Sequence, residues 1–210
     1  MARTQFLLCV ITFLVLLQVA GLCYSIAAAE TNIHTDQSSL LALKSSVTYD
    51  PENTLANNWS NSTFVCNWAG VTCGLVHHNR LRVESLNLSF MGLVGTIPPH
   101  LGNLSFLVNF SARNNNFYGI LPNELSRLSQ LKYINFGSND LTGKIPSWLG
   151  LLSKLAKLFL QSNRFSGSIP TSICNLTSLE IINLSENQLS GEYILTLTKS
   201  KFSENNISYV

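Results

Sequence analysis

Charged side chains are scarce in this chain of 210 residues. Asp, Glu, Lys and Arg together make up 11% of the sequence, and the formal net charge is only +2. A nucleic-acid-binding surface needs cations gathered into a patch, and so few scattered charges do not supply one. We therefore expect no nucleic-acid partner.

The sequence also lacks the patterns that accompany catalysis or metal binding. It has four histidines, and none stands at a metal-ligand spacing from a carboxylate or a thiol. No Ser, His and Asp combination forms a nucleophile motif, and the glycines do not make a phosphate-binding loop. We expect a protein that is not an enzyme and that needs no metal or cofactor.

Long apolar runs are missing except at the N-terminus. Arg3 precedes an apolar stretch from Phe6 to Ala20, and three alanines at 27–29 offer a small-residue cleavage site. This pattern predicts a secretory signal peptide at residues 1–29. A membrane anchor is the alternative, but the run is short for a span of about 20 residues. With no membrane span elsewhere, we expect a secreted or extracellular protein, or a cell-surface one if it belongs to a longer membrane receptor.

A phrase that returns every 24 residues dominates the rest of the sequence. Its leucines, asparagines and glycines keep one register, at Leu104, Leu128, Leu152 and Leu176; Asn115, Asn139, Asn163 and Asn187; and Gly119, Gly143, Gly167 and Gly191. Counting back one period adds a copy from Leu81, with Met91 in place of the asparagine. A period of this length indicates stacked supersecondary units. Residues 81–194 therefore predict an α/β solenoid of five repeats.

The copy that starts at Leu128 shows how each repeat would fold. Ile134 and Phe136 are two residues apart, so they point to the same, buried face of a short strand, while Tyr133 and Asn135 point outward. One such strand cannot bury its apolar side alone, and stacked copies give a parallel sheet with a continuous core. The asparagine amide, with two donors and an acceptor, is expected to bond the turn backbone inside the coil.

The phrase resembles the plant-specific leucine-rich repeat. Segments "LSQLKYINFGSNDLTGKIPSWLG" and "LSKLAKLFLQSNRFSGSIPTSIC" match its pattern closely. The resemblance implies a right-handed coil with a parallel concave β-sheet, and a short second strand or tight turn at the Ile-Pro segment. Residues 30–80 resemble the helical N-terminal cap of the same family, whose role is to cover the apolar end of the first repeat.

The cap has two features of its own. A helix is expected to begin at Thr35 or Asp36 and to bury Leu40, Leu43 and Val47 on one face. Further on, two cysteines flank a six-residue segment, and in a secreted chain a disulfide between Cys66 and Cys73 is the default.

Two other features concern the end of the chain. Cys174 is the odd cysteine, and we expect a small buried thiol, with an intermolecular disulfide as the alternative. The phrase breaks after Gly191, and residues 195–210 read as an irregular tail. Receptor kinases of the resembled family continue into further repeats, a membrane span and a kinase, so we interpret the chain as a truncated, receptor-like fragment.

Function in this architecture belongs to the outward strand positions. Arg113, Tyr133, Lys157 and Phe159 stand out among small polar residues there, and we predict that they form a contact patch. The resemblance to a receptor-like kinase ectodomain implies a peptide or protein ligand and a co-receptor ectodomain as partner. The alternatives are a secreted inhibitor of cell-wall hydrolases like the polygalacturonase-inhibiting proteins, a short co-receptor ectodomain, or a non-functional fragment.

Glycosylation sites are also expected on a secreted chain with Asn-x-Ser/Thr sequons. The sequons in predicted loops are the better candidates, namely Asn58, Asn61, Asn103 and Asn175. Those at Asn87, Asn109 and Asn183 fall on outward strand positions, where a glycan would obstruct binding.

Overall fold

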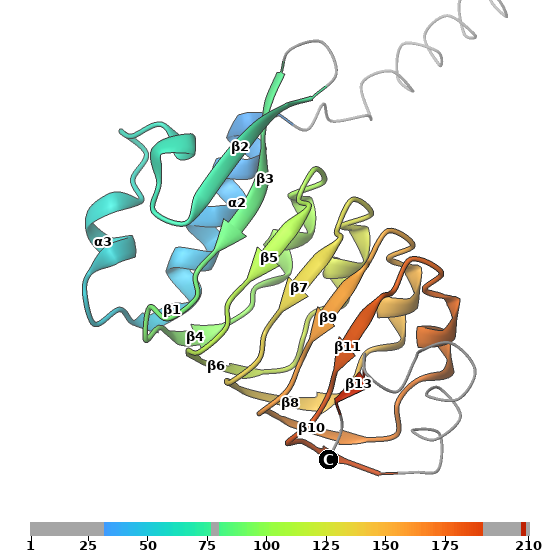
Figure 1. Ribbon diagram of the computed structural model, residues 1–210. Coiled ribbons are helices and arrows are strands. Elements are labelled where there is room, and N and C mark those ends of the chain that lie inside the picture. Colours follow the sequence, from blue (N-terminus) through green and yellow to red (C-terminus); the bar gives the residue numbers. More distant parts are fainter. Residues whose placement is uncertain (1–31, 77–79, 191–206, 209–210) are drawn as a thin grey trace, which may run out of the picture. The chain divides into compact units, whose positions relative to one another are not determined.

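The repeats and their cap form one continuous core in the computed structural model, which describes residues 32–76, 80–190 and 207–208 (Figure 1). The expected signal peptide at 1–29 and the break in the phrase after Gly191 lie outside these residues. Each repeat runs as a strand, a turn, a second strand and a short 3-10 helix. The predicted leucine-rich-repeat solenoid is thus confirmed.

The larger of two sheets combines the first strands of the repeats with one strand of the cap and with residues 207–208, which were expected to lie in an irregular tail. Its seven strands lie in the order β13-β11-β9-β7-β5-β3-β2. Every pairing is parallel except that of β2 with β3, which belongs to the cap. The strands are β2 (Val71–Val76), β3 (Arg80–Asn87), β5 (Asn109–Ser111), β7 (Tyr133–Asn135), β9 (Lys157–Phe159), β11 (Ile181–Asn183) and β13 (Ile207–Ser208).

The second strands of the repeats form a second sheet, and each of these strands lies just before the Ile-Pro position of its copy. The order in this sheet is β1-β4-β6-β8-β10-β12, and β1 alone is antiparallel to its neighbour. Gly143, the last residue but one of its strand, has φ +84, a left-handed conformation that side chains disfavour. The strands are β1 (Val47–Tyr49), β4 (Val94–Thr96), β6 (Asn116–Gly119), β8 (Asp140–Lys144), β10 (Arg164–Gly167) and β12 (Gln188–Leu189).

Short 3-10 helices complete each coil on the side away from the larger sheet (Figure 1). Each begins after a proline at 98, 122, 146 or 170, whose fixed φ suits the entry to a helix. They are η3 (Pro99–Asn103), η4 (Asn123–Arg127), η5 (Ser147–Leu151) and η6 (Thr171–Asn175). The leucines of the phrase fill the space between these helices and the sheet, and Leu104, Leu128, Leu152 and Leu176 are all fully buried.

The repeated asparagines bond the backbone inside the coil, as expected. Oδ1 of Asn139 accepts from the N–H of Phe117 at 2.9 Å, and its Nδ2 donates to the carbonyl oxygens of Ala112 and Phe136 at 2.9 and 3.1 Å. Asn115, Asn163 and Asn187 make the equivalent bonds. Each asparagine therefore serves the turn of its own copy and the turn of the copy before it.

The cap opens with a helix, α2 (Ile33–Ser46), which begins earlier than expected. Asn32, not Thr35 or Asp36, is the N-cap, and its Oδ1 accepts from the N–H groups of His34 and Thr35. Val47 was expected on the helix but begins β1 instead. Leu40 and Leu43 are buried as predicted.

Asp36 has a different role because it pairs with the first repeat. Its carboxylate accepts from Nε and Nη2 of Arg82 at 2.8 and 2.7 Å, and from the N–H of Val83 at 2.9 Å. Asp36 is 0% and Arg82 2% exposed, so the ion pair is buried between α2 and β3. Because the Asp36 carboxylate makes these contacts with β3, it does not cap α2.

The rest of the cap consists of α3 (Thr54–Asn58), the 3-10 turn η1 (Val65–Asn67) and the hairpin of β2 and β3. The predicted disulfide joins Cys66 to Cys73. The indole rings of Trp59 and Trp68 stack with centroids 5.2 Å apart and close the core on this side.

Cys174 is exposed, which corrects the expectation of a buried thiol. The same position is Gly102 and Gly150 in other copies, where an added Cβ would lie 2.2 and 2.3 Å from a carbonyl oxygen of the following coil. Cys174 lies on η6, the last 3-10 helix of the described repeats.

No helix in the described ranges has both the length and the apolar character needed to cross a bilayer.

Candidate functional site

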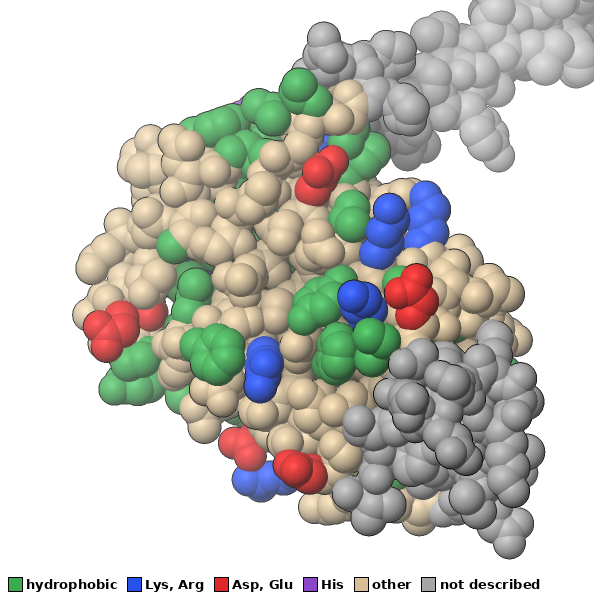
Figure 2. All heavy atoms as spheres, in the orientation of Figure 1, with side chains coloured by type: hydrophobic (Ala, Val, Ile, Leu, Met, Phe, Trp, Pro, Cys, Tyr) green, Lys and Arg blue, Asp and Glu red, His purple; other side chains and the backbone are tan. Residues whose placement is uncertain are grey.

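The outward side of the larger sheet, here called the open face, carries three rows of positions that run across the strands. Parallel pairing places residues 24 apart beside one another, as the phrase predicts. The rows are Ser85, Asn109, Tyr133, Lys157 and Ile181; Asn87, Ser111, Asn135, Phe159 and Asn183; and Ser89, Arg113, Gly137, Gln161 and Ser185. Figure 2 shows a surface dominated by uncharged polar side chains and backbone, with a few hydrophobic, basic and acidic side chains among them.

The structure brings three of the four predicted contact residues together on β7 and β9. The rings of Tyr133 and Phe159 are 5.8 Å apart between centroids and inclined at 52°. Lys157 lies directly beside Tyr133 in the sheet register, and its side chain is exposed. These residues form an aromatic pair flanked by a cation.

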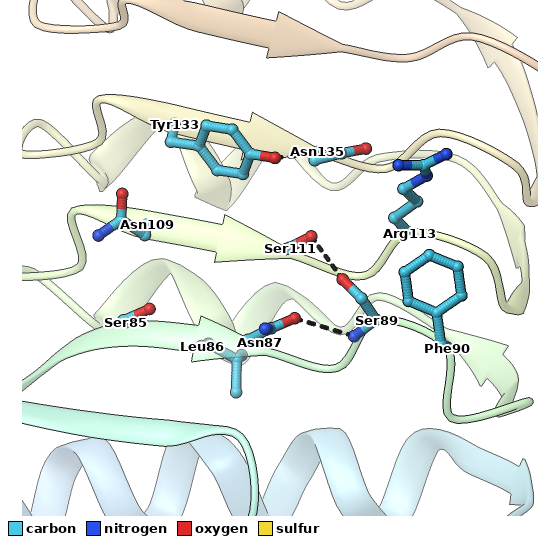
Figure 3. A pocket seen from close by; sticks show the side chains of 10 residues that line it. All are labelled: Ser85, Leu86, Asn87, Ser89, Phe90, Asn109, Ser111, Arg113, Tyr133 and Asn135. Carbon is cyan, nitrogen blue, oxygen red and sulfur yellow. Dashed lines mark hydrogen bonds between the residues drawn. The ribbon is translucent and has the colours of Figure 1, made fainter.

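Arg113, the fourth predicted residue, lies at a hollow of about 470 Å³ on the same face (Figure 3). Its guanidinium sits over the ring of Phe90, 5.4 Å from the centroid. A cation over an aromatic ring at an exposed site gains about 0.5–1 kcal/mol. Tyr133 lines the hollow as well, so it connects the aromatic pair with the region of Arg113.

Phe90 is the residue of this site that the sequence reasoning missed. Its side chain is 64% exposed, and its backbone is left-handed with φ 63. The same turn position is left-handed in every copy, but the other copies hold small or polar residues there, at Asn114, Ser138, Ser162 and Glu186. An aromatic residue at an otherwise polar position of the phrase was the available signal. Bulky residues are uncommon in this conformation, which marks Phe90 as a functional candidate.

Hydrogen bonds hold the polar floor of the hollow in place. The hydroxyls of Ser89 and Ser111 are 2.7 Å apart, and Oδ1 of Asn87 accepts from the N–H of Ser89 at 3.1 Å (Figure 3). Asn135 faces outward as expected and lines the hollow, but little of it is exposed; its Nδ2 donates to the Tyr133 hydroxyl at 3.0 Å, and its Oδ1 accepts from the N–H of Gly137. The Tyr133 ring is thereby fixed over its own strand.

The candidate glycosylation residues lie away from the hollow. Asn61 is exposed after α3, and Asn103 and Asn175 end η3 and η6, which are 3-10 helices where loops were expected. Asn58 is the last residue of α3, and its Oδ1 accepts from the N–H of Ala69. Glycosylation at these four residues stays a prediction.

Sequence profiles agree with this architecture. A profile described as "Leucine rich repeat N-terminal domain" matches residues 33–74, and one described as "Leucine Rich Repeat" matches 82–104, 130–152 and 154–176. The crystal structure of the BIR2 ectodomain from Arabidopsis thaliana is 33% identical, superposes with a TM-score of 0.73, and covers 83% of this chain and 92% of its own. The chain belongs to the leucine-rich-repeat family. It resembles the N-terminal ectodomain of plant leucine-rich-repeat receptor-like kinases.

Two further relatives are longer than this chain. The LRR receptor-like serine/threonine-protein kinase EFR of Arabidopsis thaliana is 40% identical over 106 residues, which are 50% of this leucine-rich-repeat chain and 10% of the kinase. The Arabidopsis receptor kinase HAESA, in complex with the peptide hormone IDA and the co-receptor SERK1, is 30% identical with a TM-score of 0.55 and covers 74% of this chain and 30% of its own. The similarity to kinases falls on the repeats, outside any kinase domain.

Proposed function

We propose that this chain is an extracellular or cell-surface recognition module that binds a peptide or protein ligand through the open face, without catalytic activity of its own. The observation that supports this proposal most directly is the hollow beside Arg113 and Phe90, continued by the aromatic pair Tyr133 and Phe159. Aromatic residues and arginine supply most of the energy in many protein interfaces.

The relatives are consistent with this proposal. HAESA was crystallised with both a peptide hormone and a co-receptor. By analogy, a peptide or protein on the open face of this chain would form one contact, and a co-receptor ectodomain would be a second partner. Any signal would come from a kinase domain outside these repeats.

A binding experiment tests the proposal. The secreted protein is used to select peptides from a random display library, and affinities of synthetic copies are measured by calorimetry. Tyr133→Ala combined with Phe159→Ala should weaken binding about tenfold or more, because both rings contribute contact area.

Tyr118→Ala is the matched control, since Tyr118 is an exposed aromatic residue on β6 of the other sheet. It should leave affinity unchanged. Equal affinity of the open-face variant and the unmodified protein, with normal secretion of both, would count against binding through this face.

A further inference from the structure

We propose that the open face takes an acidic peptide, whose carboxylate side chain pairs with Arg113 and whose apolar side chain contacts Tyr133 and Phe159. This inference rests on the proposed function and specifies the chemistry of its ligand. It follows from the charge of the face, the geometry of Arg113 and the distance between Arg113 and the aromatic pair.

The rows of the open face carry cations only, while acidic side chains such as Glu186 lie outside these rows. None of the three rows contains Asp or Glu, whereas Arg113 and Lys157 carry positive charge and are both exposed. The hollow itself is lined by polar, apolar and aromatic residues and by one cation, with no carboxylate. A ligand that neutralises these cations is complementary to the face, and a basic one is repelled.

The side chain of Arg113 is positioned to bind a carboxylate of such a ligand. Within the described part of the chain no carboxylate pairs with its guanidinium, and its contact is with the Phe90 ring, 5.4 Å from the centroid. The ring restricts the long side chain without using its N–H donors. A guanidinium held in this way can bind a carboxylate through two parallel hydrogen bonds.

The aromatic pair favours an apolar side chain over a sugar. Tyr133 and Phe159 are inclined at 52°, and the Tyr133 hydroxyl accepts from Asn135. Two inclined, half-buried rings offer apolar contact area, whereas stacking of a sugar needs a flat exposed ring. We therefore favour a peptide over an acidic oligosaccharide.

The separation of the two contacts sets the spacing in the ligand. Phe159 lies two strands across from Arg113 and two register positions back along the strand. With strands ~4.8 Å apart and ~3.3 Å per residue, their Cα atoms are about 12 Å apart. An extended peptide covers this distance in three or four residues. The amides of Asn87 and Asn109, both exposed, line the hollow at Arg113 and are available to the part of the ligand that lies there.

Peptide selection on matched variants tests the inference. A random 12-residue display library is selected on the unmodified protein, on Arg113→Gln and on Arg164→Gln, and the enriched sequences are compared. Arg164 is the control because it is an exposed arginine on the other sheet, paired with Asp140 at 2.6 Å. The unmodified protein and Arg164→Gln should enrich Asp or Glu three or four positions from an apolar residue. Arg113→Gln should lose the acidic preference and bind the acidic peptides at least tenfold more weakly.

Two further measurements keep the outcomes distinct. Arg113→Lys retains the charge without the planar fork and should keep the acidic preference at reduced affinity, provided that it is secreted and unfolds like the unmodified protein. Enriched peptides that need Tyr133 and Phe159 but show no acidic preference would overturn this inference and leave the proposed function standing. Peptides insensitive to every open-face variant would overturn both. Binding of an oligogalacturonate that depends on Arg113, without any acidic peptide, would overturn the choice of ligand class.

Discussion

At the scale of single residues, the asparagines of the repeat act as bridges between copies. Asn163 accepts from the N–H of Leu141 and donates to the carbonyl oxygen of Phe136, both in the preceding copy, while also bonding Leu160 of its own copy. These groups are buried, where a missing partner costs about 1–3 kcal/mol each. One amide therefore stabilises two turns.

The first prediction concerns this bridge. Asn139→Leu leaves the N–H of Phe117 without its acceptor and takes from the carbonyl of Ala112 one of its two amide donors, the other being Asn115. We expect the free energy of unfolding to fall by at least about 2 kcal/mol. Urea denaturation measures it, and Asn116→Leu at an exposed position of β6 is the control. A loss no larger than that of the control would contradict the role assigned to the amide.

Residue-level reasoning predicted part of the site. The outward positions of Tyr133, Lys157 and Phe159 follow from the alternation of a strand, which a short segment of sequence displays. The hydrogen bond from Asn135 to the Tyr133 hydroxyl does not follow, because alternation gives the face of a side chain and not its partners. Phe90 was missed because its place beside Arg113 comes from a turn outside the alternating strand.

At the scale of elements, the buried ion pair fixes the cap helix to the first repeat. Asp36 on α2 and Arg82 on β3 are 46 residues apart in sequence. Ser46 adds a hydrogen bond from its hydroxyl to the carbonyl of Thr96 at the other end of the helix. The helix was predictable from its apolar spacing, but its start was not, since nothing local reveals that Asp36 is held by a distant arginine.

The second prediction addresses this junction. Asp36→Asn removes the charge that faces the buried guanidinium of Arg82, and breaking a buried pair in this way costs about 3–5 kcal/mol. We expect a corresponding drop in unfolding free energy in urea. Replacing both partners, as Asp36→Leu with Arg82→Met, should cost less than Asp36→Leu alone. If the double variant were the less stable of the two, the ion pair would not be the main contribution of Asp36.

At the scale of the whole molecule, the repeats are equivalent stacked units. The 24-residue period was enough to predict the fold, because each copy buries its apolar side against its neighbours. Five copies stacked in this way form the two sheets and the core. Cys174 is the exception that shows the limit of this reasoning. The following coil approaches Gly102 and Gly150 closely, whereas Cys174 at the equivalent position is exposed, so the burial of a position differs between copies that share the same sequence pattern.

The third prediction uses this equivalence. Deletion of residues 128–151 removes one full period and joins two copies in register, so the shortened protein should be secreted and should unfold with a smaller denaturant slope. Deletion of 128–150 shifts the following strand by one residue and exchanges its faces, so it should not fold. Secretion and urea denaturation compare the two, and equal behaviour would show that register is not what joins the copies.

The asparagine bridges also imply an order of events during synthesis. Since Asn115, Asn139, Asn163 and Asn187 each bond groups of the copy before, a coil leaving the ribosome cannot complete its own turn. Its turn acquires these hydrogen bonds only after the next copy has emerged. Folding of the nascent chain would therefore lag behind synthesis by one repeat, and the most recently synthesised coil would remain incompletely bonded.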